Sequence, residues 1–88
     1  MNIPVTKIAE NISDQGWQML ELVEKNPEIS FKTIRTKTAL SQEKAYKILS
    51  FLEGGVLITV KKLEDARSIG YVLTEYGEYA LKLKKSNS

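Results

Sequence analysis

The clearest hydrophobic pattern in the chain lies between residues 29 and 57, where apolar positions follow the spacing of two short helices. Phe31 and Ile34 share one face of the first helix, and Leu40 falls in the segment that joins the two. The second helix has an apolar stripe at intervals of three and four residues, formed by Ala45, Ile48, Leu49 and Leu52. The pattern predicts a helix-turn-helix.

The polar positions of this segment complete the prediction. Ser41 is suited to cap the second helix, and the glycine pair at 54–55 is typical of a helix stop. The face of that helix opposite its apolar stripe is polar, with Glu43, Lys47 and Ser50 at its centre and Lys44 and Tyr46 on its flanks. Long polar side chains on one helix face can reach base edges or phosphates, which indicates nucleic-acid binding.

The segment before the helix-turn-helix has two further helical patterns. In residues 3–12, Val5, Ile8 and Ile12 form a stripe that predicts a short amphipathic helix, either folded onto the core or paired with a second copy of the chain. A second helix is expected from about residue 14 to residue 25, where Asn26-Pro27 stops it. Its apolar face is wide, which predicts packing on two sides, with Trp17 as a core anchor.

The pattern changes to β-type after residue 55, because VLITVKK and SIGYVL are rich in β-branched and aromatic residues and are separated by a polar turn. These segments predict a hairpin with Tyr71 directed inward and with Lys61, Lys62 and Arg67 near its tip. The basic residues would either bind DNA or protect an edge strand from pairing. Ile29 is expected to form a brief strand beside the hairpin.

A last helix is predicted after Thr74, which is suited to cap it. Its apolar face is formed by Tyr76, Tyr79, Ala80 and Leu83. Gly77 lies inside this helix at a cost of about 1 kcal/mol relative to alanine, so a close approach by a neighbouring element is expected there. Residues 85–88 are expected to be a frayed tail.

Composition limits the classes of function. The 88 residues suffice for one small domain and leave no room for a deep catalytic cleft. The chain has no cysteine and no histidine, so thiol and imidazole catalysis, disulfides and cysteine-histidine zinc sites are excluded. With no signal-peptide pattern and no membrane-spanning run, an intracellular, cytoplasmic protein is expected.

The net charge of +2 is small, but the charge is unevenly distributed. Residues 1–30 carry two lysines against five carboxylates, whereas residues 31–67 carry eight basic residues against four carboxylates. Each lysine taken alone is adequately explained by solubility. Their segregation to the helix-turn-helix and hairpin predicts a basic face for a polyanionic partner.

The order of these elements resembles the winged helix-turn-helix transcription regulators of the MarR type. ISFKTIRTKTALSQEKAYKILSFLEGGVL is similar to that family's second helix, turn, recognition helix and exit, and DARSIGYVLTEYGEYAL is similar to its wing and last helix. The resemblance covers residues 14–84 and implies an α+β fold, with a three-helix core, a two-stranded hairpin as the wing and a C-terminal helix. It places Asp65 and Arg67 on the wing, although Ala66 separates them where the family has adjacent arginines after the aspartate.

The length predicts one domain over residues 1–88, with residues 1–13 as an N-terminal segment, and the resemblance covers its core, residues 14–84. The resemblance also implies a small regulator that occupies promoter DNA, with the recognition helix in the major groove and the basic wing beside it. The residues expected to contact double-stranded DNA are Ser30, Lys32, Thr33, Thr36, Ser41, Gln42, Lys44, Tyr46, Lys47, Lys61, Lys62 and Arg67. Glu43 opposes phosphate binding unless it accepts a hydrogen bond from cytosine.

Full-length members of that family also carry long flanking helices that build the dimer and a ligand pocket, and nothing outside residues 14–84 is long enough to form them. A monomer this small buries little DNA surface, so a homodimer is expected, paired through the Val5 stripe or through the last helix. No small-molecule ligand, cofactor, metal or enzymatic activity is expected. The alternative function is a protein-interaction module or adaptor subunit that uses Tyr46, Phe51 or the N-terminal apolar face without DNA contact.

Overall fold

Hydroxyl side chains define where the four longer helices begin. In each case the oxygen accepts a hydrogen bond from the backbone N–H three residues further on, which satisfies a donor that the first helical turn leaves unpaired. The accepting residues are Ser13, Ser30, Ser41 and Thr74, with oxygen-to-nitrogen distances of 3.1 to 3.2 Å. The predictions that Ser30, Ser41 and Thr74 begin helices are therefore confirmed.

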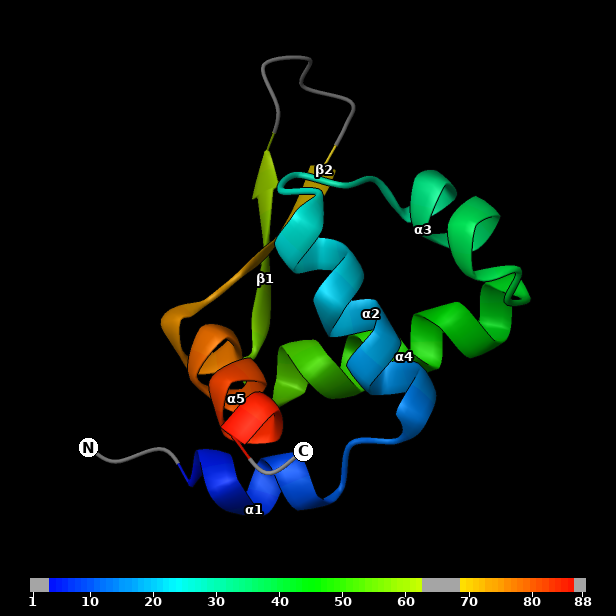
Figure 1. The fold of residues 1–88 in the computed structure, drawn as a ribbon. Coiled ribbons are helices and arrows are strands. Elements are labelled where there is room, and N and C mark those ends of the chain that lie inside the picture. The colour runs from blue at the N-terminus through cyan, green and yellow to red at the C-terminus, as the bar shows by residue number, and fades with distance from the viewer. Residues whose placement is uncertain (1–3, 63–68, 87–88) are drawn as a thin grey trace.

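The computed structural model describes residues 4–62 and 69–86, and it has the α+β winged-helix architecture that the sequence predicts (Figure 1). Helices α2, α3 and α4 form the three-helix core, the hairpin follows, and α5 lies beside α1 at the end of the molecule away from the wing. The elements are α1 (Val5–Glu10), α2 (Asp14–Lys25), α3 (Phe31–Thr38), α4 (Gln42–Gly54), β1 (Ile58–Lys62), β2 (Ile69–Leu73) and α5 (Glu75–Ser86).

Strands β1 and β2 pair antiparallel, with Ile58 opposite Leu73 and Lys62 opposite Ile69. On the other edge of β2, the Tyr71 N–H donates to the carbonyl of Ile29 at 2.9 Å. This isolated bridge confirms the brief strand expected at Ile29. The connection ties the start of α3 to the hairpin, so the wing has a fixed position relative to the helix-turn-helix.

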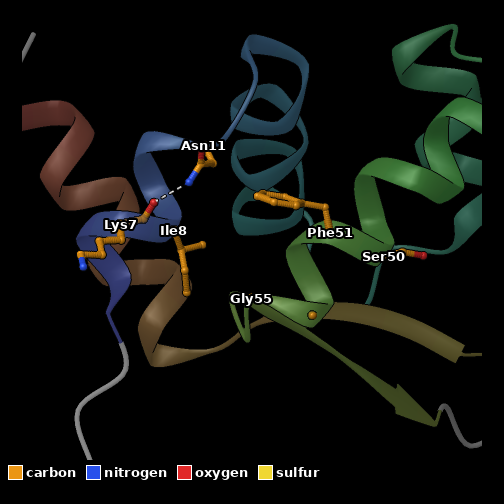
Figure 2. Close-up of a pocket in the computed structure, with 7 residues that line it drawn as sticks. Lys7, Ile8, Asn11, Ser50, Phe51 and Gly55 are labelled. Atoms are coloured by element: carbon orange, nitrogen blue, oxygen red, sulfur yellow. Dashed lines mark hydrogen bonds between the residues drawn. The ribbon is translucent and has the colours of Figure 1, made fainter.

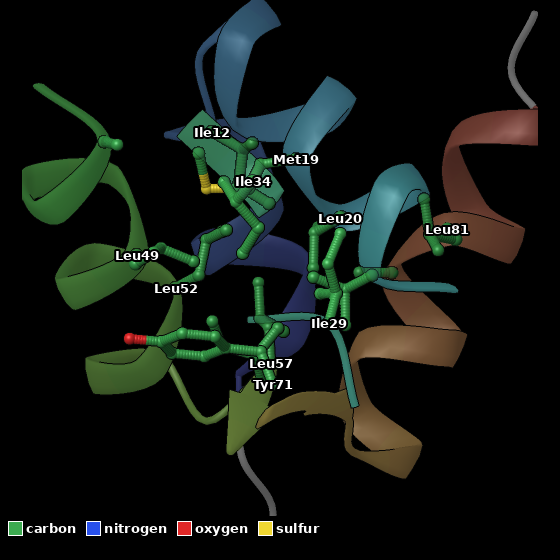
Figure 3. Packing of buried hydrophobic residues seen from close by; sticks show 14 of the residues in the cluster. Ile12, Met19, Leu20, Ile29, Ile34, Leu49, Leu52, Leu57, Tyr71 and Leu81 are labelled. Carbon is green, nitrogen blue, oxygen red and sulfur yellow. The ribbon is translucent and has the colours of Figure 1, made fainter. Parts of the chain in front are cut away.

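The core gathers side chains from every helix and from the hairpin (Figure 3). The fully buried large side chains are Met19, Leu20, Val23, Ile34, Leu49, Leu52, Leu57, Ile58 and Leu81. Trp17 packs against this cluster as predicted, while the ammonium nitrogen of Lys84 lies 5.0 Å from the centre of its ring. This contact links α2 to α5 through a cation–π interaction.

The N-terminal segment folds onto the core, which is one of the two arrangements that its apolar stripe allows. Val5 and Ile12 are buried in the core, and Ile8 packs against it half-buried, so the stripe is directed inward. The core consequently includes residues before 14. At the other end, α5 continues to Ser86, so residues 85 and 86 belong to the helix and not to a frayed tail.

Helix α4 ends in a Schellman motif, in which the Leu57 N–H donates to the Leu52 carbonyl at 2.9 Å and the Val56 N–H donates to the Glu53 carbonyl at 3.0 Å. Val56 has the left-handed conformation of this motif, with φ 56°, while Gly55 before it has φ −84°. The glycine pair marks the end of the helix, as predicted, but a β-branched residue occupies the position that favours glycine.

Replacing Val56 with glycine is therefore expected to stabilise the protein. A left-handed conformation costs an L-residue about 1–2 kcal/mol, and glycine removes most of that cost while losing some conformational entropy. We expect the free energy of unfolding, measured with urea, to rise by about 1 kcal/mol. Val60→Gly, at a similarly exposed position in extended β1, should lower it instead. Equal losses in both variants would contradict strain at Val56.

Candidate nucleic-acid interface

The residues that α4 buries in the core determine the orientation of this helix. Ala45, Leu49 and Leu52 are buried, and the Ser41 cap holds the first turn, so the opposite face of the helix is directed to solvent. The turn before it begins at Ala39, whose φ of 57° reverses the chain direction. The helix-turn-helix thus presents a rigid polar helix face, which is what reading base edges requires.

The predicted contact residues on this helix are all exposed: Gln42, Lys44, Tyr46 and Lys47, together with the capping residue Ser41. Tyr46 is the most exposed large hydrophobic residue of those described, at 64%. At the centre of the face, the Lys47 ammonium lies 3.7 Å from a Glu43 carboxylate oxygen. An exposed pair of this kind stabilises by about 0–1 kcal/mol, so Lys47 can exchange Glu43 for a phosphate at little cost.

The predicted contact residues of α3 lie at its start and on its exposed face. Lys32, Thr33 and Thr36 are exposed, and Ser30 is half-buried. The Ser30 hydroxyl donates to the Thr33 hydroxyl oxygen at 2.9 Å, and the Thr36 hydroxyl donates to the Lys32 carbonyl at 3.0 Å. These hydroxyl protons already have acceptors within the protein, so a phosphate would have to compete for them.

On the wing, Lys61 and Lys62 are both exposed on β1. The Lys61 ammonium lies 3.8 Å from the Glu28 carboxylate, which directs it toward the loop between α2 and α3. Arg67, a predicted DNA contact on the wing, and Asp65 fall outside the described residues. The structure thus brings Lys61 close to the segment that precedes α3, because the bridge between Ile29 and Tyr71 joins this segment to the hairpin.

An open groove of about 940 Å³ lies between α4 and β2; we call it the α4–β2 groove. Its apolar lining comes from three elements, namely Phe31 at the start of α3, Tyr46 on α4, and Ile69 and Tyr71 on β2. Tyr71 is buried and Phe31 half-buried, whereas Tyr46 and Ile69, at 64% and 44% exposure, stand at the mouth. Large apolar groups left this exposed commonly mark a binding surface.

The polar lining of the α4–β2 groove comes only from α4, as Gln42, Glu43 and Lys47. At its base, burial raises the pKa of the Tyr71 hydroxyl above its usual value, and the nearby Glu53 and Tyr46 raise it further. The Tyr71 side chain therefore stays neutral at physiological pH. The groove combines an uncharged aromatic base with donors and an acceptor at its edge.

A second hollow of about 440 Å³ lies between α1 and the end of α4 (Figure 2). Phe51 projects over it from α4, and Ile8 and Asn11 line it from α1. The Asn11 side-chain amide donates to the Lys7 carbonyl at 3.0 Å, which caps the short helix α1. Phe51 remains 44% exposed, so α4 has one exposed aromatic residue on each flank of its polar face.

Other kinds of site find little support in the described part of the chain. Residues 4–62 and 69–86 contain no cluster of three or more potential metal ligands among histidine, cysteine, aspartate and glutamate. Within the same residues, no helix has the length and apolar content needed to span a membrane.

Three apolar residues of the groove were not among the predicted contacts: Phe31, Ile69 and Tyr71. Phe31 was assigned to the helix-turn-helix core and Tyr71 to the inner face of the hairpin, and both do have buried or half-buried surfaces. Their meeting with Tyr46 depends on tertiary packing between segments that are distant in sequence. The sequence signal that could have indicated this groove is Ile69, an apolar residue that directly follows the polar turn of the hairpin.

Comparison with solved structures identifies the same architecture in transcription regulators. Streptococcus pneumoniae FabT, solved in complex with DNA, is similar at 20% identity with a TM-score of 0.78, covering 88% of this chain. A MarR family transcription regulator matches at 21% identity and a TM-score of 0.79, covering 94% of this chain, and MarR matches at 21% and 0.78, covering 86%. No protein-family model and no curated protein matches the sequence.

These similarities show the winged-helix fold of the MarR-type regulators, as the resemblance in sequence implied. The chain spans only about half the length of the structures it matches, since it covers 55% of FabT, 57% of the MarR family regulator and 56% of MarR. At such identities the fold is shared, and function has to be argued from the site itself.

Proposed function

We propose that this protein binds double-stranded DNA and regulates transcription by occupying promoter sites. The observation that carries this proposal is the exposed face of α4, which holds Gln42, Lys44, Tyr46 and Lys47 on a helix fixed by the core and by the Ser41 cap. The similarity to regulators that include a DNA complex supports the same use of the fold. Such a protein acts inside the cell, with the nucleoid.

In this mechanism α4 enters the major groove and reads base edges. Gln42 pairs with adenine, Lys44 and Lys47 donate to guanine or to phosphates, and Tyr46 contacts the backbone or a thymine methyl group. Glu43 accepts from a cytosine amino group or stays paired with Lys47. The protein would regulate by occupying its DNA site and would catalyse no reaction. The bound protein excludes competing proteins from the site or recruits others to it.

The positions around α4 supply phosphate contacts that set affinity and orientation. These are the exposed Lys32, Thr33 and Thr36 on α3, the Ser30 cap, and the hairpin residues Lys61, Lys62 and Arg67. We assign Arg67 to the minor groove from the resemblance of the wing alone.

We further propose that the DNA-bound form is a homodimer, which places two recognition helices about one helical turn, roughly 34 Å, apart on a palindromic site. Because the N-terminal stripe is buried, the last helix is the remaining pairing surface. Tyr79 on α5 is 52% exposed, with half-buried Tyr76 and Leu83 on the same helix.

Duplex binding across a salt series tests the proposed function. Each lysine that neutralises a phosphate releases counterions, so the affinity should fall steeply as salt rises. The double variant Lys61→Ala/Lys62→Ala should bind less tightly and reduce the slope of log K against log salt by about 1 per lost phosphate contact. Fluorescence anisotropy with random-sequence duplexes measures both quantities.

Lys7→Ala is the matched control, because Lys7 is exposed on α1, at the end of the molecule away from the wing. It should leave affinity and slope unchanged. If no duplex of random or genomic sequence binds even at low salt, DNA binding is wrong. The alternative, a protein-interaction module, would then take its place, with exposed Phe51 above the α1–α4 hollow as the observation in its favour.

A further inference from the structure

The α4–β2 groove is the largest of the hollows described above, and the recognition helix forms one of its walls. Tyr46 and Ile69 stand at its mouth with 64% and 44% of their surfaces exposed, while buried Tyr71 forms the base. Burying such surface stabilises a complex by about 25 cal/mol per Å². A group that enters this groove gains affinity if it is apolar.

The charged residues on both sides of the groove limit the class of molecule that can carry this apolar group. Lys47 lies at the α4 edge, 3.7 Å from the carboxylate of Glu43, which also lines the groove, and Lys62 is the strand partner of Ile69 on the β2 edge. An exposed pair such as Lys47 with Glu43 is worth about 0–1 kcal/mol, so the Lys47 ammonium can exchange its partner. A lysine on each side of an apolar base suits a polyanion that displays small apolar groups.

The major groove of DNA displays one apolar group, the 5-methyl group of thymine, next to the O4 acceptor of the same base. The groove offers matching chemistry. Its aromatic and aliphatic lining suits the methyl group, and the Gln42 amide and the Lys47 ammonium at its edge can each donate to O4. Cytosine has only a hydrogen atom in place of this methyl group, and the purines present polar atoms in the major groove, so these bases bury less apolar surface against Tyr46 and Ile69.

We propose that the α4–β2 groove binds the 5-methyl edge of a thymine in the major groove. This inference rests on the proposed DNA binding and adds to it a preference for thymine, read by packing against Tyr46 and Ile69. It assigns the exposed tyrosine of α4 to base recognition and makes Ile69, outside the helix-turn-helix, a specificity residue.

Two duplexes of equal length test this inference, one of alternating adenine and thymine and the other of alternating adenine and uracil. They present the same hydrogen-bonding groups and differ only in the methyl group. The full chain should bind the thymine duplex about fourfold more tightly, the ratio that corresponds to burial of one methyl group at about 0.8 kcal/mol. Anisotropy at one fixed low salt concentration gives the ratio of dissociation constants.

Single-residue variants show whether the preference for the thymine duplex comes from the α4–β2 groove or from another part of the protein. Tyr46→Ala and Ile69→Ala should each bring the ratio close to one, since each removes apolar surface at the groove mouth, whereas Tyr46→Phe should keep the ratio. Lys62→Ala should weaken binding to both duplexes equally, because phosphate contacts do not distinguish bases. Both alanine positions are exposed, so these variants should fold.

The outcomes distinguish this inference from the proposed function. Equal binding of both duplexes by the unaltered chain overturns thymine recognition while leaving DNA binding intact. A fourfold ratio that persists in Tyr46→Ala and Ile69→Ala also overturns it, because the preference would then come from the shape of the duplex. Failure to bind either duplex contradicts the proposed function itself.

Discussion

Gly77→Ala is expected to destabilise the protein strongly, although alanine favours a helix by about 1 kcal/mol over glycine. A Cβ atom at Gly77 would collide with the backbone carbonyl of Leu57, and would also lie 2.9 Å from the Leu73 side chain. The carbonyl cannot move aside easily, because it accepts a hydrogen bond from the Thr74 N–H at 3.1 Å, and Leu57 itself is fully buried. The added methyl group would therefore push α5 away from the start of β1.

We expect a net loss of about 3 kcal/mol, the upper part of the range for overpacking, because the clash is with backbone. At about 4–8 °C per kcal/mol for a domain of this size, the melting temperature should fall by at least about 10 °C. Gly54→Ala is the matched control, since a Cβ atom there meets nothing within 4 Å. Gly54→Ala should leave the melting temperature unchanged or raise it. Similar melting temperatures for the two variants would show that α5 does not pack closely against Leu57.

This glycine illustrates what the sequence could predict. A glycine inside a helical pattern is unfavourable unless a neighbour approaches closely, so the pattern alone predicted a contact at Gly77 and left its partner unidentified. The helix starts were equally accessible, because Ser30, Ser41 and Thr74 act through local hydrogen bonds within their own first turns. Local chemistry of this kind depends on few residues and can be read directly.

Features that depend on long-range packing could not be predicted in the same way. The apolar stripe of α1 had two consistent interpretations, and only the assembled core shows Val5 and Ile12 buried. The α4–β2 groove joins residues from α3, α4 and β2, so no local pattern predicts it. The left-handed Val56 also departs from the local preference, since glycines lay one and two residues earlier.

The candidate DNA contacts also combine features that local sequence predicts with features that depend on long-range packing. The exposure of those on α3 and α4 follows from helix periodicity, and all the described ones are exposed except the half-buried cap Ser30. Their pairing does not follow from periodicity, because Lys61 meets Glu28 only through the bridge between Ile29 and Tyr71. Such a pair contributes about 0–1 kcal/mol to stability, so it orders the wing base without preventing Lys61 from binding phosphate.

Tyr79→Asp is expected to convert the proposed homodimer into a monomer. A carboxylate placed in an apolar interface loses hydration without gaining a partner, and two-fold symmetry would bring two of them together. Binding to a palindromic duplex should then weaken by about 100-fold or more, because the second half-site no longer binds as part of the same molecule. Sedimentation at micromolar concentration and anisotropy with the palindromic duplex measure the two effects.

Tyr79→Phe keeps the apolar ring and should remain dimeric with unchanged affinity. Since Tyr79 is 52% exposed, the aspartate variant should keep the melting temperature of the monomeric fold, which separates loss of pairing from loss of folding. The effect of Tyr79→Asp should also differ from that of Lys62→Ala, because the wing variant weakens phosphate contact in each subunit without changing the sedimentation coefficient. An unaltered chain that sediments as a monomer, with and without DNA, would contradict the homodimer. The selectivity of the protein would then have to come from a single recognition helix, its wing and the α4–β2 groove.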